Sequence, residues 1–321
     1  MDDPQLTRLL HDAVEDIEPT DRLMTVRQQT RSRRPRRWYA AGGAVLATAA
    51  VVTGIAIAAQ PSTDPGPGPS KDPTATDSAA PGTHAVAVYY LGQTPRGPRL
   101  FREFHLRSGA PTLDEALTDL SDEPEDPDYV THWVPGGLGP ATVSDGVIRV
   151  EVFGASVHDR RPGLSAVEAE LSVQQIVYTM QAAAGQRLPV QFLSDGLPID
   201  RVYGVPTAEP IVDADQLEVL ALVSISNPAE GRVVHGEFSA DGVASSFEGT
   251  VPWELRDADD TVVRSGFAQG TMEDHLTPWE TGPIDVSDLA PGTYTFEAST
   301  DDPSGGEGGG PTTDTRSVVI Q

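Results

Sequence analysis

The chain contains no cysteine among its 321 residues. This absence excludes a disulfide framework, thiolate metal sites and cysteine nucleophiles. Core-forming side chains are also limited, since hydrophobic residues make up 38% of the sequence and aromatic residues 6%. The length therefore suits two modest domains rather than one well-filled core throughout, and any domain outside the cell must be stabilised by packing alone.

Sequence motifs that carry catalysis are absent. There is no GxSxG, HExxH or Walker A pattern, and Gly137-x-Gly139 lacks a third glycine and a strand–helix context. The seven histidines are scattered, and His158-Asp159 is followed by two arginines that would repel a metal ion. We therefore expect a protein that is not an enzyme and that has no catalytic residues, metal or cofactor.

Positive charge is scarce and unevenly placed. The formal net charge is −26, of which residues 60–321 carry −27 and residues 1–37 carry +1. A field this negative repels nucleic acid and anionic lipid. Nucleic acid is therefore excluded as a partner of the large C-terminal part.

One long apolar run, Trp38–Ala59, interrupts the sequence with 22 uncharged residues. At 1.5 Å per residue this run can cross a hydrocarbon layer of about 30 Å, so we predict one transmembrane helix. Six arginines precede it, at positions 27, 31, 33, 34, 36 and 37. The positive-inside rule then predicts a single-pass protein of the cell membrane, with a cytoplasmic N-terminus and extracytoplasmic C-terminal domains.

A cleaved signal peptide is the alternative, because Ala56-Ile57-Ala58 has the small-x-small form of a cleavage site. The leading segment of residues 1–37 is longer than the charged region of an ordinary signal peptide, which favours an uncleaved anchor.

This cytoplasmic segment contains a short amphipathic pattern that ends at Pro19. Its apolar residues recur at helical spacing and form the predicted face Leu6, Leu9, Leu10, Val14 and Ile17. Its partner is open between the membrane surface, another copy and a cytoplasmic regulator. A weakly ordered tail is equally compatible, because isolated helices this short are marginal.

Residues 60–83 hold six prolines and three glycines and are interpreted as a stalk. Residues 84–204 then mix strand and helix signals. The alternation of Val86, Val88 and Tyr90 and the return run Leu100–Leu106 predict a hairpin, and Asp145-Gly146 predicts another.

Two capping boxes, Thr112-x-x-Glu115 and Ser165-x-x-Glu168, predict helices in this part. The second helix has two apolar stripes and is expected to be covered on two sides, with Gly185 as its C-cap. Interleaved helices and strands indicate an α+β domain.

After a linker at 205–216, residues 217–321 show no helical periodicity and predict an all-β, immunoglobulin-like sandwich. The strands are expected at 217–226, 232–238, 248–256, 261–268, 282–285, 293–300 and 316–320. Tyr294 follows a turn in the manner of a tyrosine corner, and Trp253 alternates with Val251 and Leu255 as an inward aromatic.

Several segments of residues 85–201 resemble the GerMN domain of sporulation and spore germination proteins. They are Gln175–Met180, Pro189–Phe192 and Asp195-Gly196, with Ala116-Leu117 and Val134–Gly137 upstream. This resemblance implies a GerMN-like fold for the α+β domain and lateral self-association as one mechanism.

The segment Gly242–Trp253 resembles the immunoglobulin-like domain of bacterial spore germination. Pro278–Glu280 and residues 300–307 are similar to the actinobacterial form of that domain. Asp260 departs from the pattern because the family usually places glycine there, so a strained left-handed residue is expected. The resemblance implies a non-catalytic envelope module.

Candidate partner-binding residues lie in the sandwich. Trp279 is expected to be exposed as an interface anchor, and the acidic residues around a predicted hairpin form a candidate strip for a cation or a basic partner. The set is Trp279, Glu280, Asp301, Asp302, Glu307 and Arg316. Turn-forming aspartates with one surface ion pair are the alternative, and the acidic run Asp119–Asp128 is interpreted as a solvated loop.

Together these features predict a membrane-anchored envelope protein whose outer domains mediate assembly with envelope proteins or with copies of itself. The alternative is a transmembrane sensor that binds a ligand or wall fragment outside and a regulator through its cytoplasmic helix.

Overall fold

The computed structural model describes residues 83–321, apart from 110–111, 155–156, 247, 272 and 302–309. The described residues all belong to one compact unit of the chain. The predicted cytoplasmic helix face, the predicted transmembrane helix at 38–59 and residues 60–82 of the predicted stalk lie outside the described residues. Among the helices in the described part, none is both long and apolar enough to cross a membrane.

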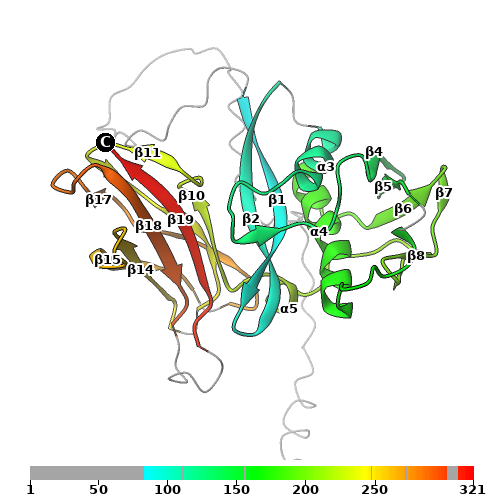
Figure 1. The fold of residues 1–321 in the computed structure, drawn as a ribbon. Helices are drawn as coiled ribbons and strands as arrows, with labels where there is room; N and C mark the ends of the chain where they lie inside the picture. The colour runs from blue at the N-terminus through cyan, green and yellow to red at the C-terminus, as the bar shows by residue number, and fades with distance from the viewer. Residues whose placement is uncertain (1–82, 110–111, 155–156, 247, 272, 302–309) are drawn as a thin grey trace, which may run out of the picture. The chain divides into compact units, whose positions relative to one another are not determined.

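The first module opens with a long hairpin (Figure 1). Strands β1 (Thr83–Thr94) and β2 (Gly97–Ser108) are antiparallel, with Tyr90 opposite Phe101, and β3 (Tyr129–Val130) pairs with the other edge of β1. The predicted alternation is confirmed, because Val86, Val88 and Tyr90 are all buried.

Both predicted helices begin at their capping boxes. Thr112 is the N-cap of α3 (Leu113–Ser121) and Ser165 is the N-cap of α4 (Ala166–Ala184). In each helix the cap side chain accepts a hydrogen bond from the amide of the third helical residue, which is a glutamate. The side chain of that glutamate in turn accepts a hydrogen bond from the amide of the cap residue. Gly185 ends α4 with φ +62°, a left-handed conformation that glycine adopts without strain.

A second sheet lies on the other side of these helices. It has the order β4-β5-β6-β7, formed by β4 (Leu138–Ser144), β5 (Val147–Val152), β6 (Val190–Ser194) and β7 (Leu197–Pro198). Strands β5 and β6 are parallel, with α4 in the crossover between them. A small pair, β8 (Arg201–Val202) and β9 (Val205–Pro206), follows.

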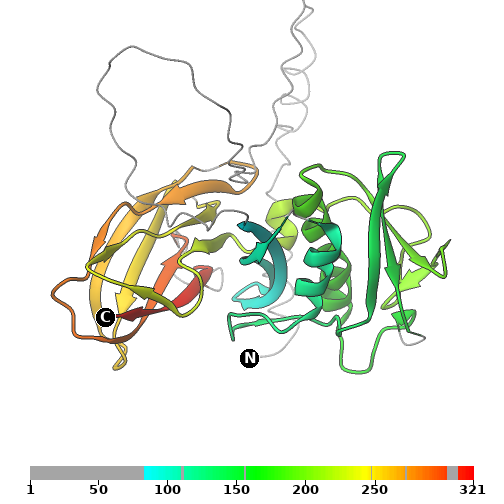
Figure 2. The ribbon, with the colours of Figure 1, turned by 90° about the horizontal axis from the view of Figure 1, so that it is seen from above.

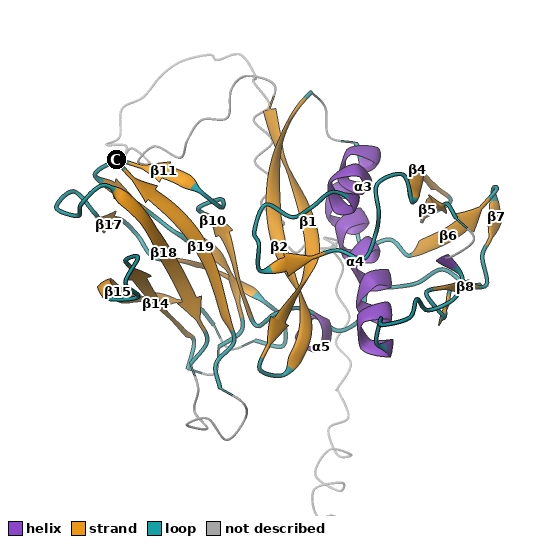
Figure 3. Cartoon of the chain, in the orientation of Figure 1, coloured by secondary structure: helices purple, strands orange, loops and turns teal. Residues whose placement is uncertain are grey.

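Helices α3 and α4 lie between the β1–β2 hairpin and this second sheet (Figures 2 and 3). The two-sided cover expected for α4 is confirmed, because eleven of its residues are buried. Ile176 and Met180 belong to the main core of the module, whereas Leu171 and Tyr178 pack with Leu91 in a separate cluster.

The cap of α4 gives a testable expectation. Replacing Ser165 by alanine leaves the Glu168 amide without its side-chain acceptor, so the free energy of unfolding should fall by about 1 kcal/mol. Ser165→Asn, another good N-cap, should retain most of the stability. Chemical denaturation monitored by circular dichroism measures both variants, and an alanine variant as stable as the asparagine variant would contradict the cap assignment.

The second module is a sandwich of two sheets. One has the order β10-β13-β16, from β10 (Val223–Asn227), β13 (Asp241–Ala244) and β16 (Thr277–Glu280). The other has the order β11-β19-β18-β14-β15, from β11 (Arg232–Val234), β19 (Thr313–Ile320), β18 (Gly292–Ser299), β14 (Thr250–Arg256) and β15 (Val262–Gln269). A short pair joins β12 (Glu237–Phe238) to β17 (Ile284–Asp285).

Three details differ from the sequence prediction. Residues 216–219 form a short helix, α5 (Gln216–Val219), because the Asp215 side chain caps the amide of Leu217. The strand expected at 232–238 is divided at Gly236, whose φ is +69°. Strands β13 and β16 were not predicted, since both are four residues long and contain or adjoin glycine or proline.

Two local predictions are confirmed. The Tyr294 hydroxyl donates to the carbonyl oxygen of Ala290 at 2.8 Å, which forms the expected tyrosine corner. Asp260 has φ +60°, the left-handed conformation expected where the family usually has glycine.

Candidate functional site

A buried ionic cluster joins the two modules. Arg316 of β19 is 2% exposed and donates to Asp314 at 3.2 Å, to the Tyr129 hydroxyl at 2.9 Å and to Asp126. Asp126 and Tyr129 belong to the first module, and their side chains are also buried. We call Asp126, Tyr129, Asp314 and Arg316 the junction cluster.

The alternation of β19 explains how two charged side chains come to be buried. In this strand Asp314, Arg316, Val318 and Ile320 share one face, because successive side chains point to opposite sides. The apolar pair at the end of the strand packs in the core of the sandwich, and the charged pair continues the same face toward the first module. An Asp-x-Arg sequence in phase with an apolar stripe was the signal available in the sequence.

Asp314 accepts more hydrogen bonds than any other carboxylate of the junction cluster. Its donors are the Tyr129 hydroxyl at 2.6 Å, the Ile225 amide at 2.6 Å, the Thr315 amide at 2.9 Å and Arg316. Because hydrogen bonds to the charged form favour that form, this carboxylate is the best stabilised as an anion.

The pKa values in the junction cluster follow from burial and from the neighbouring charges. Burial raises the pKa of Asp126 to about 7 and also raises the pKa of Asp314. Burial alone would lower the pKa of Arg316, but Asp314, Tyr129 and Asp126 outweigh it and raise the pKa, so the guanidinium stays charged. Burial raises the pKa of Tyr129 well above its usual value, which keeps the hydroxyl a donor.

A second polar group supports the loop that carries Asp126. Glu103 of β2 accepts from the amides of Glu125 at 3.0 Å and Asp126 at 3.2 Å, and lies 2.8 Å from the His105 ring. Although burial opposes it, the His105 hydrogen bond and these amides lower the pKa of Glu103. The loop is therefore held from inside the first module.

These buried residues correct the interpretation of Asp119–Asp128 as a solvated loop. Asp119 and Asp126 are each 2% exposed. Asp119 accepts a hydrogen bond from Arg107 at 3.0 Å, and Asp126 pairs with Arg316. The run therefore contributes two buried carboxylates, one in the last turn of α3 and one in the loop that follows.

An apolar contact continues the junction. Leu91, Leu100, Leu171 and Tyr178 of the first module are buried together with Leu220, which lies just before the second module. At the same place the Arg102 amide donates to the Ser224 hydroxyl at 3.1 Å, and its guanidinium donates to the Ser226 hydroxyl at 2.7 Å. The junction thus combines apolar burial with hydrogen bonds between the two modules.

Most of the predicted partner-binding residues occupy structural positions. The exposure expected for Trp279 is wrong, because β16 places it in the sandwich core at 2% exposed. Glu280 is exposed at the end of the same strand, opposite Asp241. Asp301 accepts from the Glu248 amide at 2.6 Å, and its own amide donates to the Ser246 hydroxyl at 3.0 Å.

Arg316, expected near a surface hairpin, is instead buried in the junction cluster. Asp302 and Glu307 lie outside the described residues.

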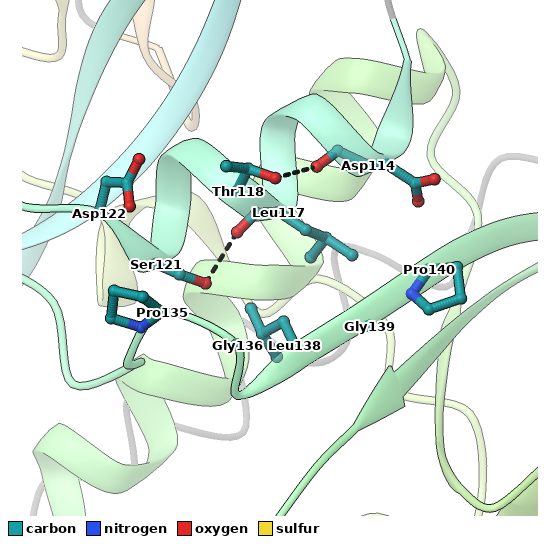
Figure 4. A pocket seen from close by; sticks show the side chains of 10 residues that line it. All are labelled: Asp114, Leu117, Thr118, Ser121, Asp122, Pro135, Gly136, Leu138, Gly139 and Pro140. Carbon is teal, nitrogen blue, oxygen red and sulfur yellow. Dashed lines mark hydrogen bonds between the residues drawn. The ribbon is translucent and has the colours of Figure 1, made fainter.

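A hollow between α3 and β4 has a volume of about 330 Å³ (Figure 4). Its hydroxyl groups are used within the helix, since Thr118 donates to the Asp114 carbonyl oxygen and Ser121 donates to that of Leu117. Asp114 also accepts from the Ala141 amide at 2.8 Å. No histidine lines this hollow, so neither hydroxyl is paired there with an imidazole base as a nucleophile would be.

Within the described ranges, no group of three or more histidine, aspartate or glutamate side chains is arranged to hold a metal ion.

Comparison with known proteins identifies both modules. Residues 87–200 match the family described as sporulation and spore germination, and residues 222–307 match the immunoglobulin-like domain of bacterial spore germination. Each module therefore matches one of the two families that the sequence resemblances indicate, in the predicted order. No curated protein matches the chain.

A solved structure with some similarity contains the tandem GerMN domains of the sporulation protein GerM from Bacillus subtilis. The identity is 14% and the TM-score is 0.32. The match covers 44% of this chain and 49% of that chain, so it spans about half of the matched protein.

Proposed function

We propose that the chain is a non-catalytic, membrane-anchored envelope protein whose two outer domains mediate protein–protein assembly, including contact between copies. The apolar run at 38–59 is the proposed anchor, with residues 1–37 in the cytoplasm and the domains outside. The two matched families support a role in the machinery of sporulation or germination.

The observation that carries this proposal is the exposed edge of the five-stranded sheet. Among the described residues, β15 pairs in its sheet with β14 alone. Phe267 on this strand is 66% exposed, and Val262 at its start is also exposed. An edge strand offers backbone groups for pairing with another chain, and an exposed aromatic side chain is unusual on an edge that a protein protects.

The opposite edge of the same sheet provides a contrast. It is β11, which is three residues long and ends the sheet beside β19. A very short edge strand is a common means of limiting edge-to-edge pairing. The edge strand β15 is therefore longer than β11 and carries an exposed aromatic side chain that β11 lacks. Of the two edges, β15 is the one suited to assembly.

Photo-cross-linking in cells tests the proposal. A photo-reactive phenylalanine derivative at position 267 of the full-length chain should give cross-links to another copy or to an envelope protein. The same derivative at position 233, on the exposed part of β11, is the matched control and should give few cross-links. Equal or absent cross-linking at both positions would contradict assembly through β15.

A further inference from the structure

The charges of the junction cluster do not balance when every group is ionised. One guanidinium, that of Arg316, lies between the carboxylates of Asp126 and Asp314, and all three side chains are at most 4% exposed. A buried net charge of −1 is costly, because the solvation that stabilises a lone carboxylate in water is lost. Binding one proton would restore neutrality.

Hydrogen bonding indicates which carboxylate takes this proton. Asp314 has four donors, whereas Asp126 accepts from the Asp128 amide at 2.8 Å and from Arg316. The anion with more donors is the more stable one. Asp126 is therefore the group that is neutralised first.

The other elements packed around Asp126 add negative charge. Asp314 of β19 and Glu230, in the loop before β11, both face it and raise its pKa. In the first module, Glu103 of β2 accepts a hydrogen bond from the amide of Asp126. The exposed Asp128, two residues after Asp126, and Tyr129 of β3 complete the groups of this module near Asp126. His105 contacts Glu103, and Arg316 is the cation that lowers the pKa of Asp126.

We propose that the junction is a proton-controlled latch, in which a neutral Asp126 holds the two modules together and an ionised Asp126 loosens them. The cluster lies across the contact between the modules, so its stability changes the free energy of docking directly. The inference concerns the coupling of the two domains and does not depend on what they bind.

The direction of the pH dependence follows from the burial of Asp126. Its pKa in the docked state is about 7, above the value of about 4 expected for a solvated aspartate. Between pH values of about 4 and about 7 the docked state therefore binds more protons than the undocked state. Docking is strongest near pH 4 and weakens as the pH rises toward 7. The lowered pKa of Glu103 acts only when the pH falls below about 4, outside this range.

Hydrogen exchange of the purified full-length chain tests the latch. The reporters are amides whose hydrogen bonds cross the junction, those of Arg102, bonded to the Ser224 hydroxyl, and Ala221, bonded to the Leu100 carbonyl oxygen. After correction for intrinsic exchange rates, their protection should fall between pH 5 and pH 7, by up to tenfold per pH unit, and level off above about pH 7. Protection that is constant or rises over this range would overturn the proposal.

Two matched variants locate the effect. Asp126→Asn mimics the neutral acid and should make protection independent of pH within about twofold. Asp128→Asn removes the same charge from an exposed side chain two residues away, keeps an acceptor oxygen for the Thr315 hydroxyl, and should keep the slope of the wild-type chain. A slope retained in Asp126→Asn would overturn the assignment to Asp126. If this variant fails to fold, the pH profiles of the wild type and of Asp128→Asn decide the question.

Discussion

Replacing Arg316 by methionine should lower the free energy of unfolding by about 3–5 kcal/mol at pH 7, the cost of breaking a buried ion pair. The substitution leaves Asp314 and Asp126 buried without their shared cation, and it removes donors from the Tyr129 hydroxyl and the Ile225 carbonyl oxygen. Methionine keeps most of the side-chain volume, so lost packing contributes little. Chemical denaturation at pH 7 measures the change.

Arg187→Met is the matched control for this prediction. Arg187 also pairs with an aspartate, Asp213 at 2.8 Å, but its side chain is 58% exposed. An exposed pair contributes at most about 1 kcal/mol, so the control should change stability little. An equal loss in the free energy of unfolding for the two variants would contradict the burial of the ion pairs in the junction cluster.

Replacing Trp279 by alanine should destabilise the chain by about 3–5 kcal/mol, as expected for an emptied aromatic site in a core. The ring packs on Gly242, its cross-strand partner, where a Cβ atom would lie 2.8 Å from the indole. A Cβ atom there would also lie 2.0 Å from the Ser224 carbonyl oxygen, so Gly242→Ala should be strongly destabilising as well. Denaturation followed by tryptophan fluorescence and circular dichroism measures both variants.

Gly292→Ala provides the comparison for the glycine substitution. A Cβ atom at Gly292 would meet its nearest neighbour, the Tyr294 ring, at 3.8 Å, which is an ordinary contact. This variant should stay within about 0.5 kcal/mol of the wild type. A Gly242→Ala variant that is equally stable would contradict the close approach of β10, β13 and Trp279.

The sequence predicts those elements whose signals are local. The capping boxes at Thr112 and Ser165, the glycine cap at Gly185 and the Asp145-Gly146 turn act within a few residues, and each is present in the structure. The tyrosine corner is local in the same sense, since its bond joins residues 290 and 294. Such features need no knowledge of distant partners.

Features that depend on distant partners are predicted poorly. Trp279 lies in a four-residue strand beside proline, and only its pairing with β13 makes it a core residue. Arg316 looks like a surface charge until the loop that contains Asp126, 190 positions earlier, is placed against it. A charged pair in phase with an apolar stripe indicates burial, but it does not name the partner.

In the proposed function the two domains, rather than the N-terminal segment, bind the protein's partners. Cross-linking in cells from position 267 tests it most directly, in the full-length chain and in a variant with Leu9, Leu10 and Val14 replaced by aspartate. We expect the same cross-linked envelope proteins, or copies of the chain, in both. Cross-links from position 267 that disappear in the aspartate variant would contradict it and support the sensor alternative.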